Sequence, residues 1–347
     1  MIKYISGLNG IRAIAVIFVI ISHRFPADHI IQVFPLGSYG VDVFFVLSGF
    51  LISRTLFFQI LSDQEHRLTN LIIIKNFFIR RSLRIFPIYY LLLFFMFLTG
   101  GIIGNQFREN IVWYIFYGVN YLNYFENKWF GSLAHLWSLS VEEQFYILWP
   151  LSLLFIFKKR ILLLISILII VGTCYPFFCS GMINILTLSC INAFGVGALL
   201  AYVEIVEPKY ESLFLKISKF IFFPTLFLIY YHNIVNILPY FSERLAISLI
   251  AVSIIAYCRY NAKSLLVTQL LGNKILNFIG IISYGIYLYH NIVPKYWVWG
   301  LNKLGWNDPT SINSFSYWEF IIQTTLIFCI SYFSWFLIEK PILNFKK

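Results

Sequence analysis

The segment GVDVFFVLSGFLI, residues 40–52, carries a single charge, Asp42, in an otherwise apolar run. The segment before it, residues 9–25, is also rich in apolar residues and contains His23 near its end. A charged side chain at the centre of a membrane helix costs about 2.5–3.5 kcal/mol on insertion scales, so such groups face a protein interior or a water-filled cavity. We therefore expect two membrane spans here, with His23 and Asp42 forming a site between them. Ser48 and Gly49 in the same run suit close packing of one helix on another.

The composition predicts an all-α, polytopic membrane helical bundle. The 347 residues are 60% hydrophobic and only 12% charged, whereas soluble domains are about 25% charged. The apolar runs do not alternate with polar residues as the strands of a β-barrel do. A formal net charge of +11 would suit nucleic-acid binding, but the charges follow membrane topology instead. The five cysteines lack the spacing of metal ligands, and we expect no metal.

A membrane span needs roughly 20 apolar residues, and the chain accommodates about ten as a single domain over residues 1–347. With both termini in the cytoplasm, most Lys and Arg residues fall on the inner side, as the positive-inside rule requires. The apolar stretch 113–124 is short, and we interpret it as interfacial or re-entrant. The predicted spans are 9–25, 38–58, 84–105, 138–157, 161–178, 184–204, 217–232, 243–258, 275–299 and 317–338. The basic residues on the outer side are Arg24, Arg108, Lys128, Arg244, Lys295 and Lys303.

In this topology the buried ionisable groups gather in the outer half of the bundle. Besides His23 and Asp42, they include Glu142 and Glu143 at the start of span four and His290 in span nine. A carboxylate that orients an imidazole is a general-base arrangement. The positive end of a helix dipole would explain one of the two glutamates but hardly both, and His290 also suits a satisfied buried histidine.

The inner side carries a cluster of arginines. Arg80, Arg81 and Arg84 lie within about one helical turn, and Arg81 and Arg84 share a face. Arginine binds phosphate bidentately, although the positive-inside rule alone also explains such a cluster. Arg12 lies eleven residues before His23, so the two share a helix face about 16 Å apart.

Five motifs resemble those of the acyltransferase-3 family, integral-membrane O-acyltransferases that modify bacterial surface carbohydrates. They occur in family order over nearly the whole chain. The motifs are GLNGIRAIAVIFVIISH at 7–23, GVDVFFVLSGFLI at 40–52, RRSLRIFP at 80–87, HLWSLSVEEQFYILWP at 135–150 and SYGIYLYH at 283–290.

The resemblance implies an acyl-CoA co-substrate, usually acetyl-CoA, and a carbohydrate acceptor such as O-antigen (lipopolysaccharide) or an exopolysaccharide. It implies that His23, Asp42 and Glu142 are catalytic. It matches Arg81 and Arg84 to the family's R-x-x-R pair and Arg12 to its first-span arginine. From this we expect acyl-CoA phosphates to bind Arg80, Arg81 and Arg84, with the pantetheine arm passing Arg12. Residues expected to bind the acceptor or to have a structural role are Glu143, His135, His290 and Ser48. No permanently bound cofactor is implied.

The resulting hypothesis is transfer of an acyl group, in most family members acetyl, to a sugar hydroxyl at the outer side of the bacterial inner membrane. His23 either deprotonates that hydroxyl for direct transfer or, as a variant, carries the acyl group itself. Some family members carry a C-terminal extracytoplasmic domain. This chain ends soon after span ten, so we expect direct transfer or a separate partner. A proton-coupled secondary transporter is the alternative, because buried Arg, His, Asp and Glu also suit a proton relay; however, no inverted repeat is apparent.

Overall fold

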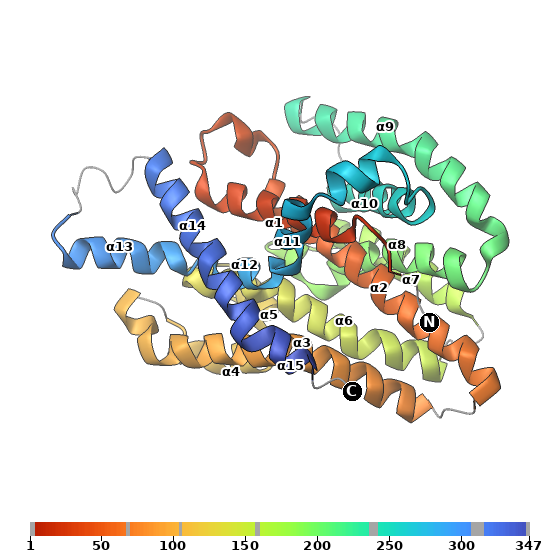
Figure 1. The fold of residues 1–347 in the computed structure, drawn as a ribbon, viewed down its shortest axis with the longest axis horizontal. Helices are drawn as coiled ribbons and strands as arrows, with labels where there is room; N and C mark the ends of the chain where they lie inside the picture. The colour runs from red at the N-terminus through yellow and green to blue at the C-terminus, as the bar shows by residue number, and fades with distance from the viewer. Residues whose placement is uncertain are drawn as a thin grey trace.

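A computed structural model describes residues 4–66, 70–103, 106–156, 160–235, 242–306 and 316–344. These residues form helices joined by short connections, and they contain no strand, which confirms the all-helical prediction. In the view of Figure 1, α9 lies along one side of the bundle and α3 along the opposite side. The longer helices are α1 (Leu8–Arg24), α2 (Leu36–His66), α3 (Asn70–Thr99), α6 (Trp137–Leu151), α7 (Ile161–Cys174), α8 (Thr187–Ile205), α9 (Glu211–Val235), α10 (Glu243–Tyr260) and α14 (Tyr317–Ser334).

Seven helical segments among the described residues are long and apolar enough to cross a membrane. The chain is therefore a multi-pass membrane protein, although by this measure the number of spans is smaller than the ten predicted. The segments are Leu36–Leu61, Asn70–Ile103, Gly131–Ile156, Ile161–Phe178, Thr187–Ile205, Pro208–Val235 and Tyr317–Asn344. Two predicted spans end at residues 105 and 157, which lie outside the described residues.

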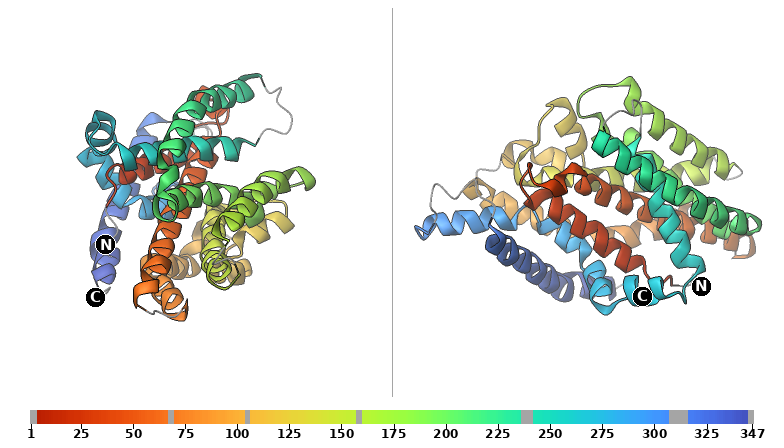
Figure 2. Two further views of the ribbon diagram at one scale, coloured as in Figure 1. Left: turned by 90° about the vertical axis from the view of Figure 1, so that its right-hand side faces the viewer. Right: turned by 90° about the horizontal axis from the view of Figure 1, so that it is seen from above.

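The prediction of one continuous span over 275–299 is wrong. The chain here forms three short helices, α11 (Lys274–Ile281), α12 (Ser283–Tyr289) and α13 (Val293–Lys303). Pro294 stands in the first turn of α13, where its missing N–H and fixed φ suit the start of a helix rather than its interior. In Figure 2, α13 extends from one end of the bundle. The break leaves His290 directly after α12.

The stretch 113–124, predicted as interfacial or re-entrant, lies in two short helices and the turn between them. It forms α4 (Ile111–Ile115) and α5 (Val119–Phe125), both far shorter than a membrane span.

Helix α2 packs tightly against both α1 and α8. A Cβ atom at Gly49 of α2 would lie only 2.2 Å from the carbonyl oxygen of Phe194, and one at Gly197 of α8 would lie 2.1 Å from that of Val46. Only glycine allows the two backbones to approach this closely. The expectation that Gly49 permits close packing is thus confirmed. Figure 1 shows α2 running through the middle of the bundle.

Candidate active site

A cavity of about 90 Å³, lined by both charged and apolar side chains, opens between α1, α2, α3, α6 and α12. Arg12 enters it from α1, Arg81 and Arg84 from α3, and Glu142 from α6. These residues are distant in sequence, yet the fold brings three guanidinium groups and one carboxylate to the same space. Such a cavity suits an anionic ligand, since arginine forks bind phosphate or carboxylate oxygens.

Two hydroxyl groups hold the Glu142 carboxylate in place. Ser48 Oγ donates to Oε1 at 3.0 Å, and Tyr146 Oη donates to Oε2 at 3.0 Å. Tyr146 also lies beneath Arg81, whose Cζ is 5.3 Å from the centre of the tyrosine ring, a cation–π contact. The cavity wall therefore orients both a carboxylate and a guanidinium group.

The neighbouring Glu143 has a different environment. It is buried and does not line the cavity, and its Oε1 has no hydrogen-bond partner among the described residues. Of the two adjacent glutamates, Glu142 is therefore the one available to a ligand in the cavity.

One arginine of the cluster on α3 does not reach the cavity. Arg80 is exposed and absent from the cavity wall, and its Nε donates to the carbonyl oxygen of Asn76 at 3.0 Å. The expectation that Arg80 joins Arg81 and Arg84 at one site is not met, because consecutive residues of a helix point about 100° apart.

Three histidines form a second cluster beside the cavity. The ring of His23, at the end of α1, lies 5.0 Å from that of His290, which lies 4.7 Å from that of His135. His23 is exposed, whereas His135 and His290 are 4% and 0% exposed. No group of three or more His, Cys, Asp or Glu side chains in the described part of the chain has an arrangement that could hold a metal ion.

Tyr287 and Ser138 connect the histidine cluster to the cavity, since both line its wall. Tyr287 Oη donates to the carbonyl oxygen of His135 at 2.7 Å and lies 2.5 Å from Ser138 Oγ. The two sites therefore share a wall, with His23 at the end farther from the arginines.

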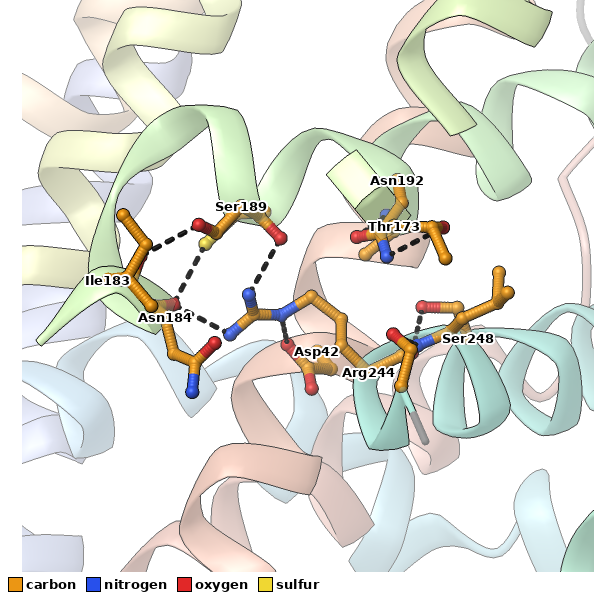
Figure 3. Close-up of polar contacts among 12 residues, drawn as sticks. Asp42, Thr173, Ile183, Asn184, Ser189, Asn192, Arg244 and Ser248 are labelled. Atoms are coloured by element: carbon orange, nitrogen blue, oxygen red, sulfur yellow. Dashed lines mark hydrogen bonds and ion pairs between the residues drawn. The ribbon is translucent and has the colours of Figure 1, made fainter. Parts of the chain in front are cut away.

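Asp42 does not orient His23, and this part of the sequence-based prediction is wrong. Its Oδ1 accepts a hydrogen bond from Arg244 Nε at 2.7 Å (Figure 3), while the aromatic contact of His23 is with His290. The cause is helix periodicity. Val41, Phe44 and Ser48 line the cavity on one face of α2, whereas Asp42 lines a separate pocket with Arg244.

Sequence reasoning does not identify Tyr146, Tyr287 or Arg244. Helical spacing offers a signal for the first two, because Tyr146 lies four residues after Glu142 and Tyr287 three residues before His290. The sequence places Arg244 at an outer flank of the bundle, and nothing in it pairs this residue with Asp42.

The fold and these two sites define a multi-pass helical membrane protein with a charged internal cavity. The chain belongs to the acyltransferase domain family, acyltransferase-3, whose model matches residues 5–340. This finding confirms the resemblance seen in the five motifs.

Two bacterial relatives match nearly the whole chain. It is 30% identical to the Listeria monocytogenes "Peptidoglycan O-acetyltransferase OatA", in an alignment that covers 98% of this chain and 56% of the relative. It is 29% identical to the Bacillus subtilis "Putative peptidoglycan O-acetyltransferase YrhL", with 98% and 55% covered. The chain thus spans about half the length of these relatives. No solved structure matches it.

Proposed function

We propose that this protein is a membrane O-acetyltransferase that moves an acetyl group from acetyl-CoA to a hydroxyl of a saccharide on the outer side of the bacterial inner membrane. The names of both relatives specify peptidoglycan, so peptidoglycan is the first acceptor to test. O-antigen and exopolysaccharides belong to the same chemical class. The proposed orientation keeps both termini in the cytoplasm.

The observation that carries this proposal is the convergence of Arg12, Arg81 and Arg84 in one cavity. Three cations that share one internal site with a single carboxylate, Glu142, are costly unless a further anion joins them. The phosphates of CoA supply such an anion, and arginine binds them through paired N–H donors. Arg81 and Arg84 would hold the phosphates, with Arg12 deeper along the donor.

His23 is the proposed general base. Its exposed ring removes the proton from a sugar hydroxyl, and the hydroxyl oxygen forms a bond to the thioester carbonyl carbon. The carbon–sulfur bond then breaks, and the departing thiolate takes the proton from His23 to give CoA thiol. The products are the acetyl ester and a neutral histidine, as general acid–base catalysis requires.

Glu142 is the proposed acceptor-positioning or proton-relay group. Ser48 and Tyr146 fix both of its oxygens, so its orientation does not depend on the ligand. The cavity lined by Arg12, Arg81 and Arg84 is called the arginine cavity below. The acetyl group would pass from this cavity to His23, beside the hydrogen-bonded pair Ser138 and Tyr287.

The test is an assay of purified protein in lipid nanodiscs with acetyl-labelled acetyl-CoA and peptidoglycan fragments, beside O-antigen and exopolysaccharide fragments. We expect the label on a glycan as an alkali-labile ester, and transfer by the His23→Ala variant at a rate about 10²–10⁴-fold lower. If the label stays on CoA with every glycan, the proposal fails. Acceptor-independent proton movement in liposomes would then favour the transporter alternative.

A further inference from the structure

The histidine cluster contains a hydrogen-bond acceptor that no described residue satisfies. His290 Nδ1 lies 2.7 Å from the carbonyl oxygen of Tyr287. A carbonyl oxygen can only accept, so Nδ1 carries the proton and donates it. In the neutral ring Nε2 is then a bare acceptor, and this atom is buried without a partner among the described residues. Leaving such a group unpaired costs about 1–3 kcal/mol.

His135 cannot supply the missing proton. Its Nδ1 lies 3.0 Å from the carbonyl oxygen of Ser132, so its neutral ring is held in the same tautomer as that of His290. Its own Nε2 is likewise buried without a partner within the described ranges. Two bare acceptors side by side cannot hydrogen-bond to each other.

His23 is the ring next to His290 that is free to donate. Its centroid lies 5.0 Å from that of His290, and no hydrogen bond to the described residues fixes its tautomer. The nearby guanidinium of Arg24 donates through Nη2 to Gln323, while its buried Nε has no partner among the described residues and is the competing donor. To present a ring N–H to His290 Nε2, the exposed His23 side chain has to rotate from its present position.

We propose that His290 is the positioning residue for His23: its Nε2 accepts one ring N–H of His23 and leaves the other ring nitrogen unprotonated, as the base that faces the acceptor hydroxyl. This inference rests on the proposed function. His290 thereby takes the part that a carboxylate has in a catalytic triad, orienting the imidazole and selecting its tautomer. A neutral imidazole can orient the His23 ring from the buried position of His290, where an unpaired carboxylate would be costly.

The experiment compares His290→Gln with His290→Met. The two side chains have similar length and volume, but only glutamine offers an acceptor oxygen near the position of Nε2. We expect the methionine variant to lose at least tenfold in kcat relative to the glutamine variant. The KM for acetyl-CoA should change less than twofold in both, because His290 does not line the arginine cavity. Equal kcat values for the two variants would overturn the inference, and thermal melting of each variant controls for folding.

A second arm separates this inference from the proposed function. If His290 acts through His23, then adding His290→Met to His23→Ala leaves the residual transfer rate unchanged. A further fall of the same size as in the wild-type background means that His290 acts on another group, such as Arg24, and overturns the inference. Full activity of the His23→Ala single variant would instead refute the proposed function.

Discussion

Asp42 on α2 and Arg244 on α10 form a buried ion pair, in which Oδ1 accepts a hydrogen bond from Nε at 2.7 Å. The same guanidinium donates through Nη1 to the carbonyl oxygen of Ser189 at 2.8 Å and through Nη2 to that of Asn184 at 2.9 Å. One arginine thus ties α2 and α10 to the chain at the start of α8 (Figure 3). This arrangement gives Asp42 an architectural role.

Replacing Asp42 by alanine leaves the charge of Arg244 buried without its carboxylate. Breaking a buried pair from one side typically costs about 3–5 kcal/mol, so we expect a clear fall in the thermal melting temperature. The Asp42→Ala/Arg244→Met double variant should recover part of the loss. A variant that melts normally but has lost all transfer activity would instead place Asp42 in the chemistry.

The His23→Ala variant should lose transfer and keep its fold. General-base catalysis contributes about 10²–10⁴-fold in rate, and we expect a fall in kcat within that range. Because His23 lies outside the arginine cavity, the affinity for CoA should stay within about twofold when measured by calorimetry. Loss of CoA binding together with activity would show that the substitution disturbs the donor site.

The arginine cavity predicts a difference between adjacent residues of one motif. Arg81→Ala removes a guanidinium that lines the cavity, whereas Arg80→Ala removes an exposed one. A lost charge-assisted contact is worth about 1.5–3 kcal/mol, which corresponds to about 10–150-fold weaker CoA binding. Both variants lose one positive charge, so Arg80→Ala is the matched control. Equal effects would mean that the cluster acts only through its net charge.

Close packing of α2 on α8 predicts that Gly49→Ala and Gly197→Ala are destabilising. Each new methyl group would meet a backbone carbonyl oxygen at 2.2 or 2.1 Å, and overpacking of this kind costs about 1–3 kcal/mol. Gly101→Ala is the control, because nothing lies within 4 Å of the position that its new methyl group would take. Melting temperatures should fall for the first two variants and stay unchanged for the third. An unchanged Gly49→Ala melting temperature would show that the two helices separate easily.

Much of the candidate site is predictable from single residues. His23, Arg12, Arg81 and Glu142 stand out because a charged or titratable group in an apolar frame is costly to keep. That reasoning ranks residues one at a time. It cannot say which two costly groups meet, and so it pairs Asp42 with His23 instead of with Arg244.

The organisation of spans is predictable in part for a similar reason. Hydropathy identifies the long segments such as α8, whose boundaries lie close to those predicted. It places one span over 275–299, where backbone breaks separate α11, α12 and α13. The second break falls just before Pro294, in the first turn of α13, and mean apolar content does not register such a residue.

The sequence by itself determined the helical membrane class and the set of costly polar groups. The helical class follows because a segment in hydrocarbon must satisfy its backbone hydrogen bonds within its own helix. The polar groups stand out because each is costly in an apolar segment. Tertiary structure alone decided which of those groups meet. The rotation of α2 about its axis directs Ser48 toward Glu142 and Asp42 toward Arg244, and the break after α12 leaves His290 beside His23. Helix rotation is set by packing between distant segments, which no local pattern in the chain contains.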